Sequence, residues 1–212
     1  MILLTYISIL FSLIPLISGI LFYRTINSSL KPFFWYSVFL TFTECFVSFY
    51  AYTFGDNMFM YPYYGLIQYF FILIVYKYQG VFKRLNWLFF VLLLFGFALF
   101  YHDNFYLDPK PLMPLFLMIG SGFICFLLAL LFFYQELQFP KADIWKNPVF
   151  FMVVSLMFYG LGNVFYFLLF NSALSNQKAF EAISNYHEIL NCSFYTLNAC
   201  VFYFTRIWKT AY

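Results

Sequence analysis

A single carboxylate, Glu44, lies in the middle of a long apolar stretch that covers residues 33–54. If this stretch is a transmembrane helix, a rise of about 1.5 Å per residue places Glu44 about 16 Å deep, close to the membrane midplane. An acidic side chain there costs about 2.5–3.5 kcal/mol, so it must face the protein interior and either be protonated or find hydrogen-bond donors. Ser37, Thr41 and Ser48 lie on the same helical face. Glu44 is therefore a candidate for binding a ligand, a proton or a cation, and its alternative role is a hydrogen bond that supports packing.

Three further apolar stretches carry polar side chains at helical spacing. These residues are Tyr64 and Gln68 in stretch 60–78, Tyr159 and Asn163 in stretch 149–170, and His187 and Asn191 in stretch 185–205. Counted from the outer ends of the stretches, Gln68, Asn163 and Asn191 lie about 7–10 Å deep. They predict a polar pocket that is open toward the outside and is formed by these three helices together with the helix of Glu44. The alternative is that Asn and Gln only join helices, at about 0.6 kcal/mol per contact.

The histidines and cysteines form no motif for metal binding or catalysis. His102 and His187 are far apart in sequence, and neither belongs to an HExxH motif. The four cysteines lie inside apolar stretches without CxxC spacing, as expected for small buried side chains. The sequence also lacks a GxSxG motif and a Walker loop. We therefore expect no metal, no cofactor and no catalytic residue.

The composition explains why these polar residues stand out. Of the 212 residues, 65% are hydrophobic, 28% are aromatic and only 9% are charged. Soluble domains need about 25% charged residues, so both a soluble domain and a disordered chain are excluded. Seven stretches are long and apolar enough to span a membrane, at residues 2–23, 33–54, 60–78, 87–105, 112–134, 149–170 and 185–205. The expected fold is all-α, a single domain of residues 1–212 that forms a seven-transmembrane-helix bundle.

The positive charges predict an orientation for this bundle. With seven spans, nine of the eleven Lys and Arg residues fall on one side of the membrane, and only Lys110 and Lys178 fall on the other. The positive-inside rule then places the N-terminus outside and the C-terminus inside. The first stretch has no cation before Arg24, so we expect it to be a retained anchor rather than a signal peptide. Segment Lys178–Asn185 carries charged and apolar residues at helical spacing and predicts an outer amphipathic turn.

Pairs of glycines occur in two of the stretches. Gly120 and Gly122 lie in stretch 112–134, and Gly160 and Gly162 lie in stretch 149–170. Such pairs let helices approach closely, and the alternative is a hinge.

The seven apolar stretches and their few polar residues resemble a known class of proteins. The polar residues in question are Glu44, Tyr64 with Gln68, Tyr159–Asn163, and His187 with Asn191. They are similar to those of uncharacterised bacterial seven-helix inner-membrane proteins, which in turn resemble the seven-helix sensory regions of membrane histidine kinases. This resemblance covers the full length and implies a sensory role in the bacterial inner membrane. The sequence ends at Tyr212 without a kinase or cyclase domain, so signalling would depend on a partner protein.

Two other seven-helix classes are excluded by single residues. A retinal pigment needs a lysine in the middle of its last helix, and this sequence has none between Lys178 and Lys209. Sugar transporters of the PQ-loop type carry a Pro-Gln pair in each half, and this sequence has no Pro-Gln dipeptide.

Three functions are therefore weighed. The first is a receptor-like or sensory membrane protein that binds a small or lipid-like ligand in the pocket and passes motion of stretch 149–170 to the inner loops. The second is a small transporter or channel in which Glu44 carries a proton or cation. The least favoured is an intramembrane enzyme with Glu44 and His187 as acid and base, because these residues would lie about 14 Å apart along the membrane normal. The expected partners are the lipid bilayer, the ligand and a membrane or signalling protein, while a dispersed net charge of +3 argues against nucleic acid.

Overall fold

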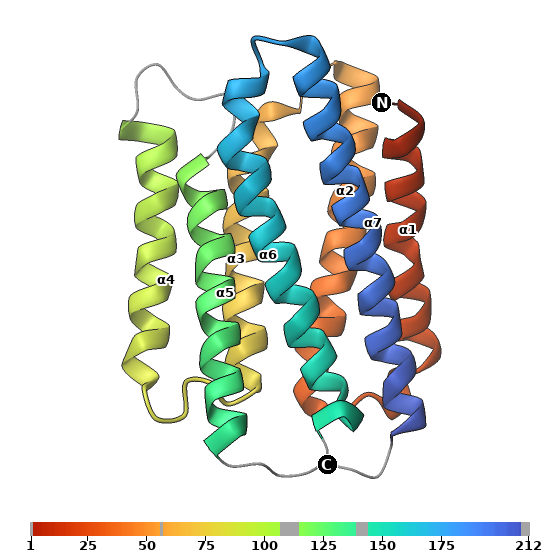
Figure 1. Ribbon diagram of the computed structural model, residues 1–212, viewed down its shortest axis with the longest axis vertical. Helices are drawn as coiled ribbons and strands as arrows, with labels where there is room; N and C mark the ends of the chain where they lie inside the picture. Colours follow the sequence, from red (N-terminus) through yellow and green to blue (C-terminus); the bar gives the residue numbers. More distant parts are fainter. Residues whose placement is uncertain (1, 56, 107–114, 139–143, 209–212) are drawn as a thin grey trace.

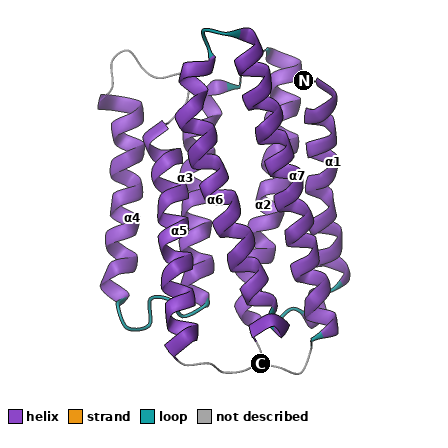
Figure 2. Ribbon diagram, in the orientation of Figure 1, coloured by secondary structure: helices purple, strands orange, loops and turns teal. Residues whose placement is uncertain are grey.

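The computed structural model describes residues 2–55, 57–106, 115–138 and 144–208. This part of the chain contains seven α-helices, and successive helices run in opposite directions (Figure 1). Figure 2 shows only helices and loops in it, so the predicted all-α fold is confirmed. The helices are α1 (Ile2–Leu21), α2 (Lys31–Phe54), α3 (Tyr61–Tyr78), α4 (Asn86–Tyr101), α5 (Leu115–Gln138), α6 (Pro148–Ala173) and α7 (Gln177–Ile207).

Local sequence signals set several helix ends. The side chain of Asn147 accepts a hydrogen bond from the backbone N–H of Val149 (2.9 Å) and caps the start of α6. The side chain of Asn176 caps α7 in the same way, with the N–H groups of Lys178 (3.1 Å) and Ala179 (3.3 Å) as donors. Helix α2 ends at Gly55, whose φ of 82° is a left-handed conformation that glycine adopts without strain.

Six of the helices form a ring, and α4 lies outside it. Helix α6 packs between α5 and α7, α1 packs against α7 and α2, and α3 packs against α2 and α5. Helix α4 contacts α3 and α5 from the outside, at the left edge of Figure 1. A Cβ atom on Gly122 of α5 would lie 2.5 Å from the carbonyl oxygen of Gly160 in α6. One glycine of each pair therefore serves close packing between α5 and α6, while Gly120 lies against Leu99 of α4 and Gly162 against Leu190 of α7.

The lower end of the ring in Figure 1, where α7 ends, is filled by aromatic side chains. Phe33 and Phe34 at the start of α2 lie 5.6 and 6.1 Å, between ring centroids, from Phe202 near the end of α7. Phe33, Tyr76 and Phe202 are fully buried. These side chains form a buried aromatic core in the lower half of the bundle.

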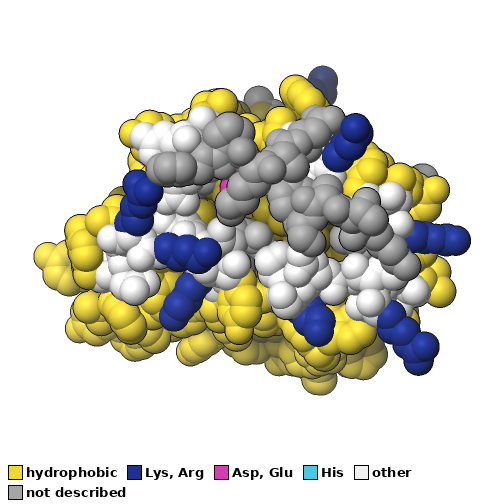
Figure 3. Space-filling view, turned by 90° about the horizontal axis from the view of Figure 1, so that it is seen from below, with side chains coloured by type: hydrophobic (Ala, Val, Ile, Leu, Met, Phe, Trp, Pro, Cys, Tyr) yellow, Lys and Arg dark blue, Asp and Glu magenta, His cyan; other side chains and the backbone are white. Residues whose placement is uncertain are grey.

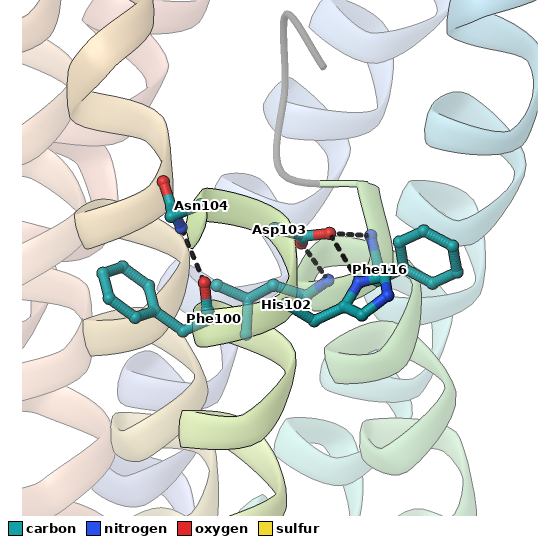
Figure 4. Close-up of polar contacts among 6 residues, drawn as sticks. Phe100, His102, Asp103, Asn104 and Phe116 are labelled. Carbon is teal, nitrogen blue, oxygen red and sulfur yellow. Dashed lines mark hydrogen bonds and ion pairs between the residues drawn. The ribbon is translucent and has the colours of Figure 1, made fainter. Parts of the chain in front are cut away.

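Asp103 joins the end of α4 to the start of α5. It lies in a π-helical turn, His102–Tyr106, and is only 3% exposed. Its carboxylate accepts hydrogen bonds from the backbone N–H groups of Leu117 (2.8 Å) and Phe116 (3.3 Å), as Figure 4 shows. Two of the N–H groups that lack partners at a helix start are thereby satisfied.

Five helices in the described residues are long and apolar enough to cross a membrane, which is consistent with an integral membrane protein. Their candidate spans are Leu4–Leu21, Met58–Tyr78, Asn86–Tyr106, Leu115–Gln138 and Pro148–Phe170. Helices α2 and α7 do not meet this criterion, although seven spans were predicted. The physical reason is that both helices carry several polar side chains, such as Thr41 and Glu44 in α2 and His187 and Asn191 in α7, which lower their mean hydropathy.

Several predicted helix boundaries were wrong by more than one turn. Helix α7 begins at Gln177 rather than at residue 185, because the Asn176 cap makes segment Lys178–Asn185 the first turns of α7. Helix α5 continues to Gln138, beyond the predicted residue 134. The predicted start of that helix at residue 112 lies outside the described residues.

Candidate ligand-binding cavity

The upper half of the ring encloses a cavity of about 540 Å³. Pockets of about 300–1,000 Å³ are typical of small-molecule sites. All six ring helices contribute to its wall, for example Thr5 of α1, Glu44 of α2, Tyr64 of α3, Ser121 of α5, Asn163 of α6 and His187 of α7. Helix α4 contributes no lining residue.

The cavity runs inward from the upper end of the bundle. Asn57, Phe180 and Ser184, which are only partly buried, line it near the connections α2–α3 and α6–α7. The buried residues Ile72, Cys125 and Leu156 line its inner end. Because both Tyr61 and Ile72 of α3 line it, the cavity extends about 16 Å along the helix at a rise of about 1.5 Å per residue.

The structure brings together every residue that the sequence singled out for a binding site. Glu44, Tyr64, Gln68, Tyr159, Asn163, His187 and Asn191 all line this one cavity. Their role in binding stays a prediction. The predicted walls were incomplete, however, because α1 and α5 also take part through residues such as Tyr6 and Cys125. Helix α1 reaches the cavity by packing against α7, and α5 reaches it by packing against α6.

Two carboxylates lie in the cavity, and each accepts a hydrogen bond from a hydroxyl group. The hydroxyl of Tyr195 donates to Oε1 of Glu44 (3.0 Å), and the hydroxyl of Thr5 donates to Oε1 of Glu188 (3.0 Å). The two carboxylates are close enough to repel each other when both are charged. Sequence reasoning missed Glu188 as a site residue, although it lies one turn before Asn191 on the same helical face.

Stacked rings hold the aromatic part of the wall in place. Tyr159 stacks on Phe194 with ring centroids 4.0 Å apart, and His187 stacks on Tyr166 at 4.1 Å. Gln68 donates to the hydroxyl of Tyr36 through Nε2 (3.1 Å). These contacts fix the orientation of rings that face the cavity.

Two asparagines differ in how their hydrogen-bonding capacity is used. Nδ2 of Asn163 donates to the backbone carbonyl of Tyr159 (3.0 Å), one turn earlier on α6. Asn191 is 3% exposed, and its Oδ1 accepts no hydrogen bond from the described part of the chain. A buried carbonyl oxygen without a donor costs about 1–3 kcal/mol, so this atom calls for a donor that the described residues do not supply.

The acidic and imidazole groups do not make a metal centre. Within residues 2–55, 57–106, 115–138 and 144–208, no three His, Cys, Asp or Glu side chains are grouped to hold a metal ion.

Comparison of the chain with protein-family models, curated proteins and solved structures finds no match. The function therefore has to be inferred from the cavity itself.

Proposed function

We propose that this protein is a receptor-like or sensory membrane protein that binds a small or lipid-like ligand in the cavity. The observation that carries the proposal is that the seven residues predicted for a polar pocket all line one cavity of about 540 Å³. The resemblance to bacterial sensory membrane regions favours the bacterial inner membrane as its location.

All seven helices cross the membrane in this proposal, including α2 and α7. Helix α2 turns Glu44 toward the cavity and leaves Phe42, Phe46 and Phe49 exposed on its outer side. Helix α7 likewise exposes Ile189 and Leu197. An apolar outer face and a polar inner face suit a helix that contacts lipid on one side and a cavity on the other, despite a modest mean hydropathy.

The N-terminus lies outside and the C-terminus inside in this proposal. Lys and Arg side chains gather around the lower face of the bundle, as Figure 3 shows. The described cations at this end are Arg24, Lys31, Lys77, Lys83, Arg84, Lys146 and Arg206, whereas Lys178 lies at the start of α7, at the opposite end. The positive-inside rule makes the lower face cytoplasmic, so the cavity opens to the outside.

Helix α6 is the element that would transmit ligand binding. It supplies Tyr159 and Asn163 to the cavity, and it packs against both α5 and α7. Its start at Pro148 lies at the basic lower face, where a signalling protein partner could detect a shift of the helix.

Native mass spectrometry of the purified protein in mild detergent tests the proposal. We expect a co-purified ligand on the wild type that is lost in Glu44→Gln and in Asn163→Ala. Phe46→Leu, on the outer side of α2 and outside the cavity wall, is the control and should keep the ligand. A ligand that stays bound equally in all three variants, or no ligand and no ligand-induced thermal shift in the wild type, would contradict the proposal.

A small transporter is the second candidate, because Glu44 and Glu188 could carry protons or cations through the cavity. Below the cavity, Phe33 and Phe202 are fully buried and in contact, and this aromatic packing favours a receptor over an open channel. Proton and cation flux into reconstituted vesicles decides between the two. Flux through the wild type that Glu44→Ala abolishes would support transport. No flux through the wild type, or flux that Glu44→Ala leaves unaltered, would remove this candidate.

A further inference from the structure

We infer that the ligand of this cavity is an organic cation, a protonated primary amine that carries an apolar group. The inference rests on the proposed function and names the class of ligand that the cavity would bind.

The charges on the cavity wall favour a cation. Glu44 and Glu188 both line the cavity, and no Lys or Arg of the described residues does. Tyr195 and Thr5, which donate hydrogen bonds to these two carboxylates, are neutral hydroxyl groups. A carboxylate held away from bulk water is stabilised in its charged form by hydrogen-bond donors or by a cation, and a bound ammonium group supplies both, whereas the wall offers no cationic Lys or Arg. An anionic ligand would meet two acidic groups and no positive charge.

The hydrogen-bond acceptors lie along one face of α7. Glu188, Asn191 and Tyr195 follow the spacing i, i+3 and i+7, and Tyr195 holds Glu44 through its hydroxyl. Oδ1 of Asn191 is buried between these positions without a donor. A primary ammonium has three N–H donors and no acceptor, and this face of the cavity offers Glu44, Glu188 and Asn191 as acceptors. The unpaired Oδ1 of Asn191 is an observation independent of the two acidic groups, and this atom also needs a hydrogen-bond donor.

The rest of the wall suits the apolar part of such a ligand. Aromatic residues line it from four helices, for example Tyr6 of α1, Tyr64 of α3, Tyr159 of α6 and Phe180 of α7. Aromatic faces attract organic cations, with about 2 kcal/mol or more where water is excluded, and they also bury apolar surface. A lone inorganic cation would use neither the rings nor a volume of about 540 Å³. An aminolipid with a phosphate group would bring a negative charge beside Glu44 and Glu188.

Three probes of one shape and different charge test the inference. They are 4-phenylbutylammonium, 4-phenylbutan-1-ol and 5-phenylpentanoate, and their affinities for the full chain in a non-ionic detergent can be measured by titration calorimetry. We expect the ammonium probe to bind about ten-fold or more tightly than the alcohol, a difference of about 1.4 kcal/mol, and the carboxylate to bind most weakly.

Substitutions then place the preference in the cavity. Glu188→Gln and Asn191→Ala should each reduce the preference for the ammonium probe several-fold. Glu181→Gln is the matched control, because Glu181 is an exposed carboxylate on the same helix that bonds to Gln177 and does not line the cavity. The trimethylammonium form of the probe lacks N–H donors and should bind more weakly than the primary amine to the wild type, and this difference should be smaller in Asn191→Ala.

Two results would overturn the inference. The first is equal affinity for the ammonium probe and the alcohol in the wild type. If Asn163→Ala then weakens both equally, the proposed ligand-binding function survives and only the cation is wrong. The second is an ammonium preference that Glu188→Gln and Asn191→Ala leave unchanged, since that probe would bind outside the cavity. Absence of binding by every probe also removes the inference, and the mass spectra of the purified protein then judge the proposed function separately.

Discussion

Two regions of this molecule hold acidic side chains in different ways, one of them fully buried and the other partly buried in the cavity wall. At the junction of α4 and α5, Asp103 receives two backbone N–H donors on its carboxylate (Figure 4). In the cavity, Glu44 and Glu188 each receive a side-chain hydroxyl and face an open space. Backbone N–H groups at a helix start need an acceptor in the folded state, whereas hydroxyl groups can turn to other acceptors. The first carboxylate therefore belongs to the fold, and the other two are available for a ligand.

The largest effect should come from Asp103→Ala. This change leaves the N–H groups of Phe116 and Leu117 without their acceptor, which costs about 1–3 kcal/mol of unfolding free energy. Thermal unfolding in detergent measures the loss, and Asp103→Asn, which keeps one acceptor oxygen, should lose less. Asn104→Ala is the control, because its amide bonds only to the carbonyl of Phe100 one turn earlier (2.8 Å). Equal losses in Asp103→Ala and Asn104→Ala would show that Asp103 has no special role in the fold.

Tyr195→Phe should have the next largest effect, and on binding rather than folding. The change removes the hydroxyl that donates to Glu44, and a hydrogen bond to a charged group contributes about 1.5 kcal/mol. We expect the affinity for 4-phenylbutylammonium to change about ten-fold, with the direction set by how far Glu44 moves from the bound ammonium. Tyr203→Phe, an exposed tyrosine on the same helix, is the control. An affinity that Tyr195→Phe leaves unaltered would separate Glu44 from the binding site.

A smaller effect is expected from Glu44→Gln and Glu188→Gln without ligand. Glutamine keeps the shape and an acceptor oxygen for Tyr195 or Thr5, and it removes a charge that is costly away from water. The unfolding free energy of each variant should therefore lie within about 1 kcal/mol of that of the wild type. Any change should be an increase, as is common when a residue selected for function is replaced. Losses as large as that of Asp103→Ala would make these carboxylates part of the fold and would erase the contrast between the two regions.

The helices and the main site residues could be predicted because their signals are local. Long apolar stretches specify helices by themselves, and a polar residue such as Glu44 or Asn191 in an apolar stretch must face the interior. Tyr195, one turn after Asn191 on the same face of α7, is the residue that donates to Glu44. The seven residues predicted for the pocket all line one cavity.

The remaining features depend on contacts between distant segments. The closeness of α5 and α6 depends on the fit of Gly122 against Gly160, and a glycine pair in sequence does not identify its partner helix. A helix start at residue 185 would leave Glu188 in the first turn, whereas the cap at Asn176 starts α7 at Gln177 and places Glu188 about three turns inside the helix. Asp103 finds its donors on α5, at Phe116 and Leu117, so its own neighbours in sequence do not reveal the contact.

The smallest effect should come from His102→Phe, which tests what satisfies Asp103. Nδ1 of His102 lies 3.9 Å from Oδ1 of Asp103, longer than either backbone hydrogen bond, and it has no hydrogen-bond partner among the described residues. The ring of His102 also packs edge-on against Phe116 with centroids 4.8 Å apart, a contact that phenylalanine keeps. The unfolding free energy should therefore change by less than about 0.5 kcal/mol. If His102→Phe destabilises the protein as much as Asp103→Ala, an ion pair rather than the backbone of α5 holds Asp103, and its carboxylate resembles those of the cavity more than it differs from them.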